Sequence, residues 1–226
     1  MSNQSTSHLF MIEPDSFYGN EQTSSSNHYQ VNEIEETSKN IAQKALSEFH
    51  ALKFAIESRG IKVTSLKGSK DCPDHIFPNW FITFDDKTMQ IFSMMAPNRR
   101  TEKKPEMIER LKETYKLTED MSNLESQNIF LESTSSMVFD RVNRCVYAGI
   151  SPRTNKDELE SWCSRNNYEL IMFETESHTG SSIYHTDVLM YVGTDMIGIC
   201  LDVIKPEYRE YVEKNVKRFH EVLLLT

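Results

Sequence analysis

The segment from residue 188 to residue 225 reads VLMYVGTDMIGICLDVIKPEYREYVEKNVKRFHEVLLL and contains one complete structural unit. It predicts two strands, a helix and a third strand, over residues 188–192, 196–203, 206–219 and 221–225. The sequence Gly193-Thr194-Asp195 separates the first two apolar runs and indicates the turn between them. The segment is therefore predicted to form a strand-strand-helix-strand unit.

The same order of elements occurs twice more, upstream of this unit. One copy predicts two strands, a helix and a short extended piece, over residues 75–84, 89–94, 105–115 and 116–118. The other predicts the corresponding four elements over residues 136–139, 146–150, 155–166 and 168–173. A strand, a long polar loop, a helix and a strand precede both copies, over residues 8–13, 15–32, 35–59 and 61–66. A repeat of this length indicates an α/β fold in which each unit packs against its neighbours.

The last residues, Leu223-Leu224-Leu225-Thr226, are an apolar strand with no polar tail behind it. A ring of such units that ended there would leave unpaired strand edges, which proteins normally avoid. Two alternatives remain open. Either another chain supplies the partner strands, as in a homo-oligomer formed through the open edge, or part of the ring is absent. We expect one domain, residues 1–226, truncated at its C-terminus.

Composition narrows the classes of function. The chain has 226 residues, 38% hydrophobic and 26% charged, with a formal net charge of −9, as expected for one soluble domain. No basic stripe is present, so nucleic acid is not an expected partner. The N-terminus has no signal-peptide pattern, and no apolar run is long enough to span a bilayer. We therefore predict a cytoplasmic protein without membrane contact.

The four cysteines are Cys72, Cys145, Cys163 and Cys200, and no two of them form a C-x-x-C pair. Their spacing indicates neither a zinc site nor a disulfide framework. Three of them fall in predicted strands or helices, so buried thiols are expected there, at Cys145, Cys163 and Cys200. No metal site is predicted.

His185 and Asp187 precede the apolar run 188–192 and follow a loop rich in Gly, Ser and Thr. If that run is a strand that includes both residues, their side chains lie on the same face, because the side chains of a strand alternate. An imidazole beside a carboxylate can hold a proton near neutral pH and transfer it. The alternative is that both are ordinary polar residues at the start of a strand.

Six segments resemble, in order along the chain, motifs of one superfamily of guanidine-modifying enzymes. They are Asn20 to Gln30, Pro73 to Phe81, Asn98 to Glu102, Leu131 to Arg141, Ser151 to Thr154 and Tyr184 to Val188. The superfamily includes amidinotransferases, arginine deiminases and dimethylarginine dimethylaminohydrolases. The motifs are most similar to those of its citrulline-utilisation branch, hydrolases related to arginine deiminase, and they cover nearly the whole chain.

The resemblance implies a five-fold pseudosymmetric α/β-propeller of ββαβ units, of which the last blade is incomplete in this chain. It also implies a reaction in which a Cys thiolate attacks the guanidinium carbon, ammonia or an amine leaves, and water or an amine resolves the covalent adduct. The expected ligand is a small guanidino or ureido compound such as arginine or citrulline. No cofactor is expected.

The resemblance also implies roles for particular residues. His185 would be the acid/base, and Glu132 would orient it or the substrate. The residues implied in substrate binding are Asn20, Asp74, Asn79, Asp187, Arg153 and one of Arg99 and Arg100. The arginines would meet a substrate carboxylate, because the planar guanidinium can form two parallel hydrogen bonds to it.

The chain departs from the family pattern in several places. None of the four cysteines matches the position of the family nucleophile, so the chain as given is expected to be inactive. Pro78-Asn79-Trp80 is one residue shorter than the corresponding family segment. If the segment is a strand, the loss of one residue moves every following side chain to the opposite face of the sheet. Ser133 and Ser135 replace glycines and would be strained at positive φ. Asp187 replaces an asparagine and adds a negative charge.

Two alternatives to an enzyme therefore stay open. One is a module that binds a guanidino compound, or a partner at its open edge, without catalysis. The other is a purely structural α/β protein, which the ordered motifs disfavour.

Overall fold

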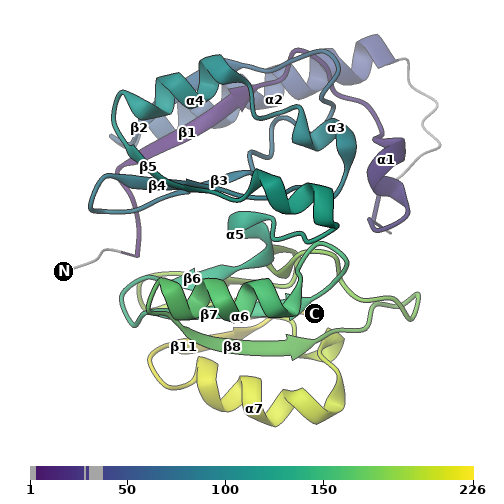
Figure 1. Cartoon of the computed structure of the whole chain (residues 1–226), viewed down its shortest axis with the longest axis vertical. Coiled ribbons are helices and arrows are strands. Elements are labelled where there is room, and N and C mark those ends of the chain that lie inside the picture. Colours follow the sequence, from purple (N-terminus) through teal and green to yellow (C-terminus); the bar gives the residue numbers. More distant parts are fainter. Residues whose placement is uncertain (1–3, 28, 31–37) are drawn as a thin grey trace.

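The computed structural model describes residues 4–27, 29–30 and 38–226, and it shows a mixed α/β fold (Figure 1). Strands β1 (His8–Glu13) and β2 (Lys62–Lys67) form a parallel pair, and helix α2 (Ser38–Glu57) lies between them in the chain. The loop predicted over 15–32 includes a short helix, α1 (Glu21–Ser24). Parts of that loop, and the first residues of the helix predicted over 35–59, lie outside the described residues.

Three units with the predicted order of elements follow. Their elements are β3 (Phe81–Thr83), β4 (Thr88–Ile91), α4 (Pro105–Lys112) and β5 (Lys116–Asp120); β6 (Val138–Asp140), β7 (Cys145–Ile150), α6 (Lys156–Arg165) and β8 (Glu169–Glu174); and β9 (Met190–Val192), β10 (Met196–Ile199), α7 (Pro206–Val216) and β11 (Glu221–Leu224). In each unit the first two strands are antiparallel, whereas the second and third are parallel and need the helix as their connection.

Short helices lie between these units, η1 (Ser122–Gln127), α5 (Ser133–Ser136) and η2 (Thr186–Val188), and within them, α3 (Pro97–Arg100) and η3 (Leu201–Val203). They shorten three of the predicted strands. Ser136 ends α5, and residue 188 ends η2, so β6 and β9 begin two residues later than predicted in each case. The run 196–203 is a strand only to Ile199. Apolar residues in a short run are typical of a buried turn as well as of a strand, which explains these differences.

The strand predicted over 75–84 is wrong for most of its length, because only Phe81–Thr83 form β3. Pro73 and Pro78 have no backbone N–H to donate to a neighbouring strand. Residues 69–79 instead form consecutive turns, closed by backbone hydrogen bonds between residues two or three apart. These turns carry Asp74 and Asn79. The segment Pro78-Asn79-Trp80, which is one residue shorter than in the family, therefore lies in turns. There the shortening does not change which face of a strand points inward.

The three long helices of the units fill the spaces between successive sheets. Helix α6 contributes Trp162 to a core that contains Val146 of its own sheet and Ile82 of the preceding one. In the same way, α7 packs between the sheets β9–β11 and β6–β8, and α4 packs between the sheet β3–β5 and the pair β1–β2. Each helix thus removes the apolar surface of two sheets from water, which is the main source of stability for such layers.

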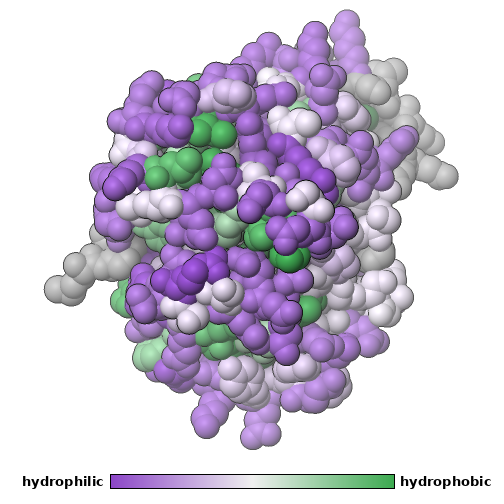
Figure 2. All heavy atoms as spheres, in the orientation of Figure 1, coloured by the Kyte–Doolittle hydropathy of each residue, from purple (hydrophilic) through white to green (hydrophobic). Residues whose placement is uncertain are grey.

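The face of sheet β9–β11 that points away from α7 has no helix of the described chain on it. Tyr191, Met196 and Leu223 are each about half exposed there. The Tyr191 ring lies directly over Gly198, where a Cβ atom would come within 2.2 Å of a ring carbon. The face of the molecule seen in Figure 2 is mostly hydrophilic, with small separate groups of apolar residues. None of the described helices has both the length and the apolar character needed to cross a membrane.

Candidate functional site

One pocket gathers most of the residues that the sequence singled out. It has a volume of about 260 Å³ and is lined by Thr23, Asn27, Asp74, Phe77, Asn79, Arg99, Ser135, Arg153, Tyr184, His185, Asp187 and Val188. The lining comes from the N-terminal loop, the turns after β2, α3, α5, the turn after β7 and the segment before β9. Residues as far apart in the chain as Thr23 and Val188 therefore meet in one place, as a ligand site built from loops would require.

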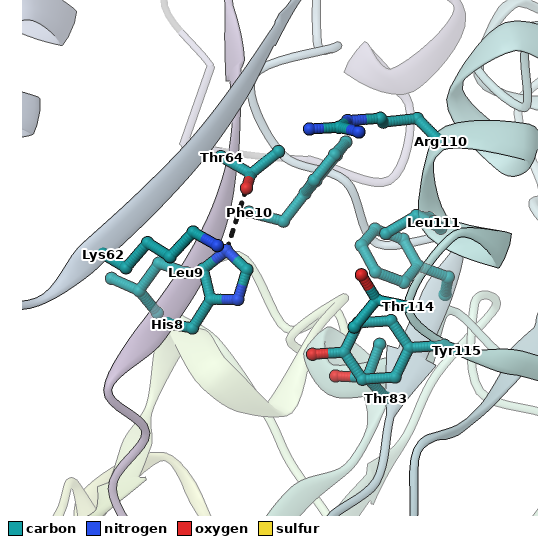
Figure 3. A pocket seen from close by; sticks show the side chains of 11 residues that line it. His8, Leu9, Phe10, Lys62, Thr64, Thr83, Arg110, Leu111, Thr114 and Tyr115 are labelled. Carbon is teal, nitrogen blue, oxygen red and sulfur yellow. Dashed lines mark hydrogen bonds between the residues drawn. The ribbon is translucent and has the colours of Figure 1, made fainter.

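A second, smaller pocket of about 100 Å³ lies between β1, β2 and α4 (Figure 3). Its polar side chains include His8, whose Nε2 lies 2.8 Å from Thr64 Oγ1. Burial and the charges of Lys62 and Lys87 lower the pKa of His8. Its lining contains Lys62 and Arg110 but no carboxylate and none of the predicted site residues. The sign of its charge is opposite to what a guanidinium ligand needs.

His185 and Glu132 form a buried pair at the main pocket. His185 Nε2 lies 2.6 Å from Glu132 Oε2, and because a carboxylate only accepts, the imidazole nitrogen donates. Glu132 is completely buried, and its Oε1 accepts from the Met95 N–H at 2.9 Å. Burial alone would raise the pKa of Glu132, but the hydrogen bond and charge of His185, with the charges of Arg153 and Arg99, lower the pKa to about 2. The carboxylate therefore stays ionised and fixes the imidazole.

The segment around His185 is a turn, so the prediction that His185 and Asp187 share a strand face is wrong. His185 precedes η2, which contains Asp187. Thr186 fixes this turn, because its Oγ1 donates to Ser136 O at 2.6 Å and accepts from Gly149 N at 2.9 Å. Both predicted residues nevertheless line the pocket.

Of the two adjacent arginines, Arg99 lines the pocket and Arg100 does not. Arg99 donates from Nε and Nη2 to the two carboxylate oxygens of Glu102, at 3.0 and 3.1 Å, and also to Phe77 O. Burial would lower the pKa of Arg99, but the charge and hydrogen bonds of Glu102 raise it. Arg100 instead donates to two backbone carbonyls, Met94 O and Met95 O, and covers the Phe130 ring.

Arg153 is held from several sides. Its Nε and Nη2 donate to Ser26 Oγ at 3.1 and 2.7 Å, and its Nη1 lies 3.6 Å from Glu132 Oε2. The guanidinium also lies over the Tyr184 ring, 4.7 Å from the centroid, a favourable cation–π geometry. The Tyr184 ring in turn lies 4.7 Å from the His185 ring, so this tyrosine orders both groups.

Two carboxylates of the pocket have only neutral hydrogen-bond partners among the described residues. Asp74 Oδ2 accepts from Asn20 Nδ2 at 2.7 Å, which places Asn20 behind Asp74 rather than in the lining. Asp187 Oδ2 accepts from Ser135 Oγ at 2.8 Å. Asp187 is open to water from the pocket, but the surrounding protein atoms desolvate it and raise its pKa. A carboxylate in this environment is stabilised by a bound cation.

The sequence did not identify several residues that build the pocket, among them Tyr184, Ser135, Ser26 and Glu102. Tyr184 and Glu102 lie inside segments that carry the family resemblance, which was a usable signal. Ser26 also lies inside such a segment, Asn20 to Gln30, but at a position where the motif specifies no residue, so it gave no signal of its own. The expected strain occurs at Ser133, which has φ of 44° and donates from Oγ to Phe81 O at 2.8 Å. Ser135 is helical, so strain there was a wrong expectation.

His75 supports the turns that carry Asp74. It is almost completely buried, its Nδ1 accepts from Ser69 N, and its Nε2 donates to Glu102 O, each at 3.1 Å. Burial lowers its pKa to about 4, with smaller contributions from Lys104 and Arg99, although the bond to Glu102 O opposes them. Neutral His75 therefore joins the turns to the loop that holds Glu102.

We expect this pKa shift to make the protein sensitive to acid. In the unfolded chain His75 titrates near 6.5, so its stabilising contribution is complete above that pH and is lost as the pH falls to about 4. The loss should be about 3 kcal/mol. His75→Gln keeps an acceptor and a donor without titrating. Urea denaturation at pH 7 and pH 4 should show a smaller pH dependence for the variant, and an equal pH dependence would contradict the assignment.

All four cysteines lie in the described part of the chain, and none of them lines the pocket. Burial raises the pKa of Cys145 to about 11 and that of Cys163 to about 12, so both thiols stay protonated near neutral pH. Cys72 is buried beside Thr101 Oγ1, at 3.4 Å. Cys200, expected to be buried, is partly exposed because it follows the end of β10.

Comparison with solved structures reveals the same fold in an arginine dihydrolase and in DDAH. The chain superimposes on the apo structure of ArgZ, a cyanobacterial arginine dihydrolase, with a TM-score of 0.69 and 14% identity over 97% of this chain. It spans only 30% of that ArgZ chain. The substrate-bound N-terminal domain of ArgZ gives 0.70 and 15%, with 96% of this chain and 75% of the domain covered. DDAH from Pseudomonas aeruginosa with citrulline gives 0.65 and 16%, covering 100% and 77%.

No curated protein sequence matches the chain. A family model does: the one described as N,N dimethylarginine dimethylhydrolase, eukaryotic, matches residues 13–223. The match covers nearly the whole chain and includes every residue that lines the main pocket. The chain therefore belongs to this dimethylarginine dimethylhydrolase family, within the superfamily of arginine deiminases and amidinotransferase-like proteins.

Proposed function

We propose that the pocket binds a guanidino or ureido compound, with Asp74 and Asp187 facing its planar guanidinium or urea group and His185 beside it. The observation that carries the proposal is the buried His185–Glu132 pair, whose Nε2 and Oε2 atoms lie 2.6 Å apart. This pair lies at a cavity in which the other ionic groups that solvent can reach are the carboxylates of Asp74 and Asp187. Planar guanidinium groups bind carboxylates through paired, charge-assisted hydrogen bonds. The substrate- and citrulline-bound relatives named above agree with this ligand class.

The proposal extends to the architecture. The three ββαβ units and the β1–β2 pair are consistent with four blades of a five-fold pseudosymmetric α/β-propeller, formed by one domain over residues 1–226. The cytoplasmic location and an oligomer through the open edge, both predicted from the sequence, remain part of this proposal.

In the proposed chemistry, Glu132 holds His185 through Nε2, which leaves Nδ1 to exchange a proton with the ligand. Cleavage of a guanidinium C–N bond requires a nucleophile that adds to its carbon and a proton for the departing nitrogen. His185 can supply the proton. The four cysteines lie outside the pocket lining, which favours the second candidate function, binding of the ligand without turnover by this chain.

We therefore expect no ammonia release from arginine, citrulline, agmatine or methylated arginines, and a thermal shift with at least one of them. Asp74→Asn should weaken binding by roughly tenfold, because it removes a charge that faces the ligand. Asp71→Asn, which changes an exposed aspartate of the same turns, serves as the matched control. Binding measured by calorimetry and turnover measured by ammonia assay separate the outcomes. Turnover would contradict the binding-only candidate, and absence of binding at millimolar ligand would contradict the proposed function.

A further inference from the structure

The second pocket, between β1, β2 and α4, has basic side chains in its lining although the chain as a whole has a formal net charge of −9. Lys62 forms no ion pair with another described residue, whereas Arg110 pairs with Glu113 at the surface. Burial, followed by the charges of Lys62 and Lys87, lowers the pKa of His8 in the same lining. The pocket is therefore a local region of positive potential, which favours a negatively charged ligand.

Three hydroxyl groups in this lining have no hydrogen-bond partner among the residues that the structure describes. They belong to Thr83 of β3 and to Thr114 and Tyr115, which follow α4. Figure 3 shows these three side chains on one side of the cavity, with His8 and Thr64 on the opposite side. A hydroxyl can donate its hydrogen to an anion while its lone pairs stay free to accept from water. The three hydroxyls thus supply donors where the neighbouring charges favour an anion.

The pair formed by His8 and Thr64 adds one more donor. His8 Nε2 lies 2.8 Å from Thr64 Oγ1, so one hydrogen lies between the two atoms. A neutral imidazole has one N–H and a threonine has one O–H, so one of these donors stays available whichever group donates within the pair. Neither side chain has another hydrogen-bond partner in the described part of the chain. Donors from three strands and from the end of α4 therefore surround one cavity.

Apolar side chains form the rest of the lining, and they are Leu9, Phe10, Phe81 and Leu111. The rings of Phe10 and Phe81 pack edge to face, with their centroids 5.4 Å apart, and Leu111 is buried. The cavity volume of about 100 Å³ is several times what one water molecule needs. The lining therefore suits a small ligand that combines an anionic group with an apolar body, whereas inorganic phosphate has no part to place against the two rings.

We propose that this pocket is a second binding site, and that it takes a small carboxylate with a short aliphatic or aromatic body. Lys62 supplies the opposite charge, the hydroxyls and the His8–Thr64 pair orient the carboxylate, and Phe10 and Phe81 cover the body of the ligand. The site shares no lining residue with the main pocket. The proposal therefore does not depend on the function proposed for the main pocket.

Titration of the full chain with isobutyrate, followed by nuclear magnetic resonance of the His8 imidazole, tests the proposal. The charged groups that face His8 are Lys62 on β2, Lys87 between β3 and β4, and Arg110 on α4, and all of them are cations. Bound isobutyrate should therefore raise the pKa of His8, because an opposite charge beside the imidazole favours its protonated form. Isobutyramide has nearly the same shape without the charge and should bind at least about tenfold more weakly.

Two lysine variants separate this site from the charge of the whole protein. Lys62→Gln should weaken isobutyrate binding about fivefold, because it removes the cation that faces the carboxylate. Lys214→Gln removes the same charge from an exposed position on α7 and should change the affinity by less than about twofold. Both lysines are exposed, so neither substitution disturbs the core.

Each other outcome would overturn the proposal. Equal affinities for isobutyrate and isobutyramide would show that the charge of the ligand is not recognised. Equal effects of the two lysine variants, or a pKa of His8 that isobutyrate leaves unchanged, would place the bound anion elsewhere. Tighter binding of inorganic phosphate than of isobutyrate would contradict the role of the apolar wall and thus the carboxylate assignment.

Discussion

Arg99→Met is expected to reduce the free energy of unfolding by about 3 kcal/mol, because it leaves the Glu102 carboxyl, whose pKa burial already raises to about 7, without its hydrogen-bond donor. Both side chains are almost inaccessible to water, and two hydrogen bonds of 3.0 and 3.1 Å join them. Arg99 also donates to Phe77 O, which accepts from Asn79 N as well, so its loss would remove one of the two hydrogen bonds of that carbonyl and loosen the turns that carry Asp74 and Asn79. Urea denaturation at pH 7 measures the effect.

The double variant Arg99→Met with Glu102→Met is the informative control. Replacing both members of a buried ion pair by apolar residues is often nearly neutral, so the double variant should be more stable than Arg99→Met alone. Arg165→Met removes an arginine that pairs with Glu158 and Glu119 at the surface, and it should cost much less. Equal losses for Arg99→Met and Arg165→Met would show that burial of the first pair is energetically unimportant.

Glu132→Gln is expected to have the second large effect, about 3 kcal/mol of stability at pH 7, in addition to disordering His185. The pKa of Glu132 falls from 4.5 in the unfolded chain to about 2 in the folded one. Its contribution is therefore complete above pH 4.5 and is lost as the pH falls toward 2. The difference in unfolding free energy between the original chain and the variant should therefore shrink as the pH falls from 4.5 to about 2. The pH dependence assigned to His75 lies mostly higher, between about 4 and 6.5.

Glu174→Gln provides the matched control, because Glu174 pairs with Lys205 at the surface. This exposed pair should contribute little. The amide introduced by Glu132→Gln would keep an acceptor for the Met95 N–H, so the variant tests the charge rather than this hydrogen bond. A loss no larger than that of Glu174→Gln would contradict the view that Glu132 is ionised and stabilised by His185 and Arg153.

Much of the fold could be predicted because the repeated units follow simple patterns. The helix over 155–166 and the strand over 168–173 each agree with the structure to within one residue at both ends, since their apolar positions follow a clear period. The region 75–80 could not be predicted in this way. Trp80 is buried there from a turn, whereas Phe77 is half exposed, and the burial of residues in turns follows no sequence period.

The site could be anticipated in part. Asp74, Asn79, Arg99, Arg153, His185 and Asp187 line one pocket, as their positions in the motifs implied. The choice between Arg99 and Arg100 could not be made from sequence, because it depends on which side of the short helix α3 faces the cavity. The covering of Arg153 by Ser26 and Tyr184 depends on contacts between distant segments, 127 positions apart in the case of Ser26, and no local pattern encodes these.

The helices that fill the space between successive sheets have a consequence for how the chain unfolds. If one unit unfolded alone, its helix would no longer cover the preceding sheet, and the apolar core of that neighbouring unit would be exposed to water as well. Thermal unfolding should therefore be a cooperative transition of neighbouring units rather than a series of independent steps. A fragment cut between β8 and β9 would lack α7 and would present Tyr147 and Phe173 to solvent, which favours aggregation.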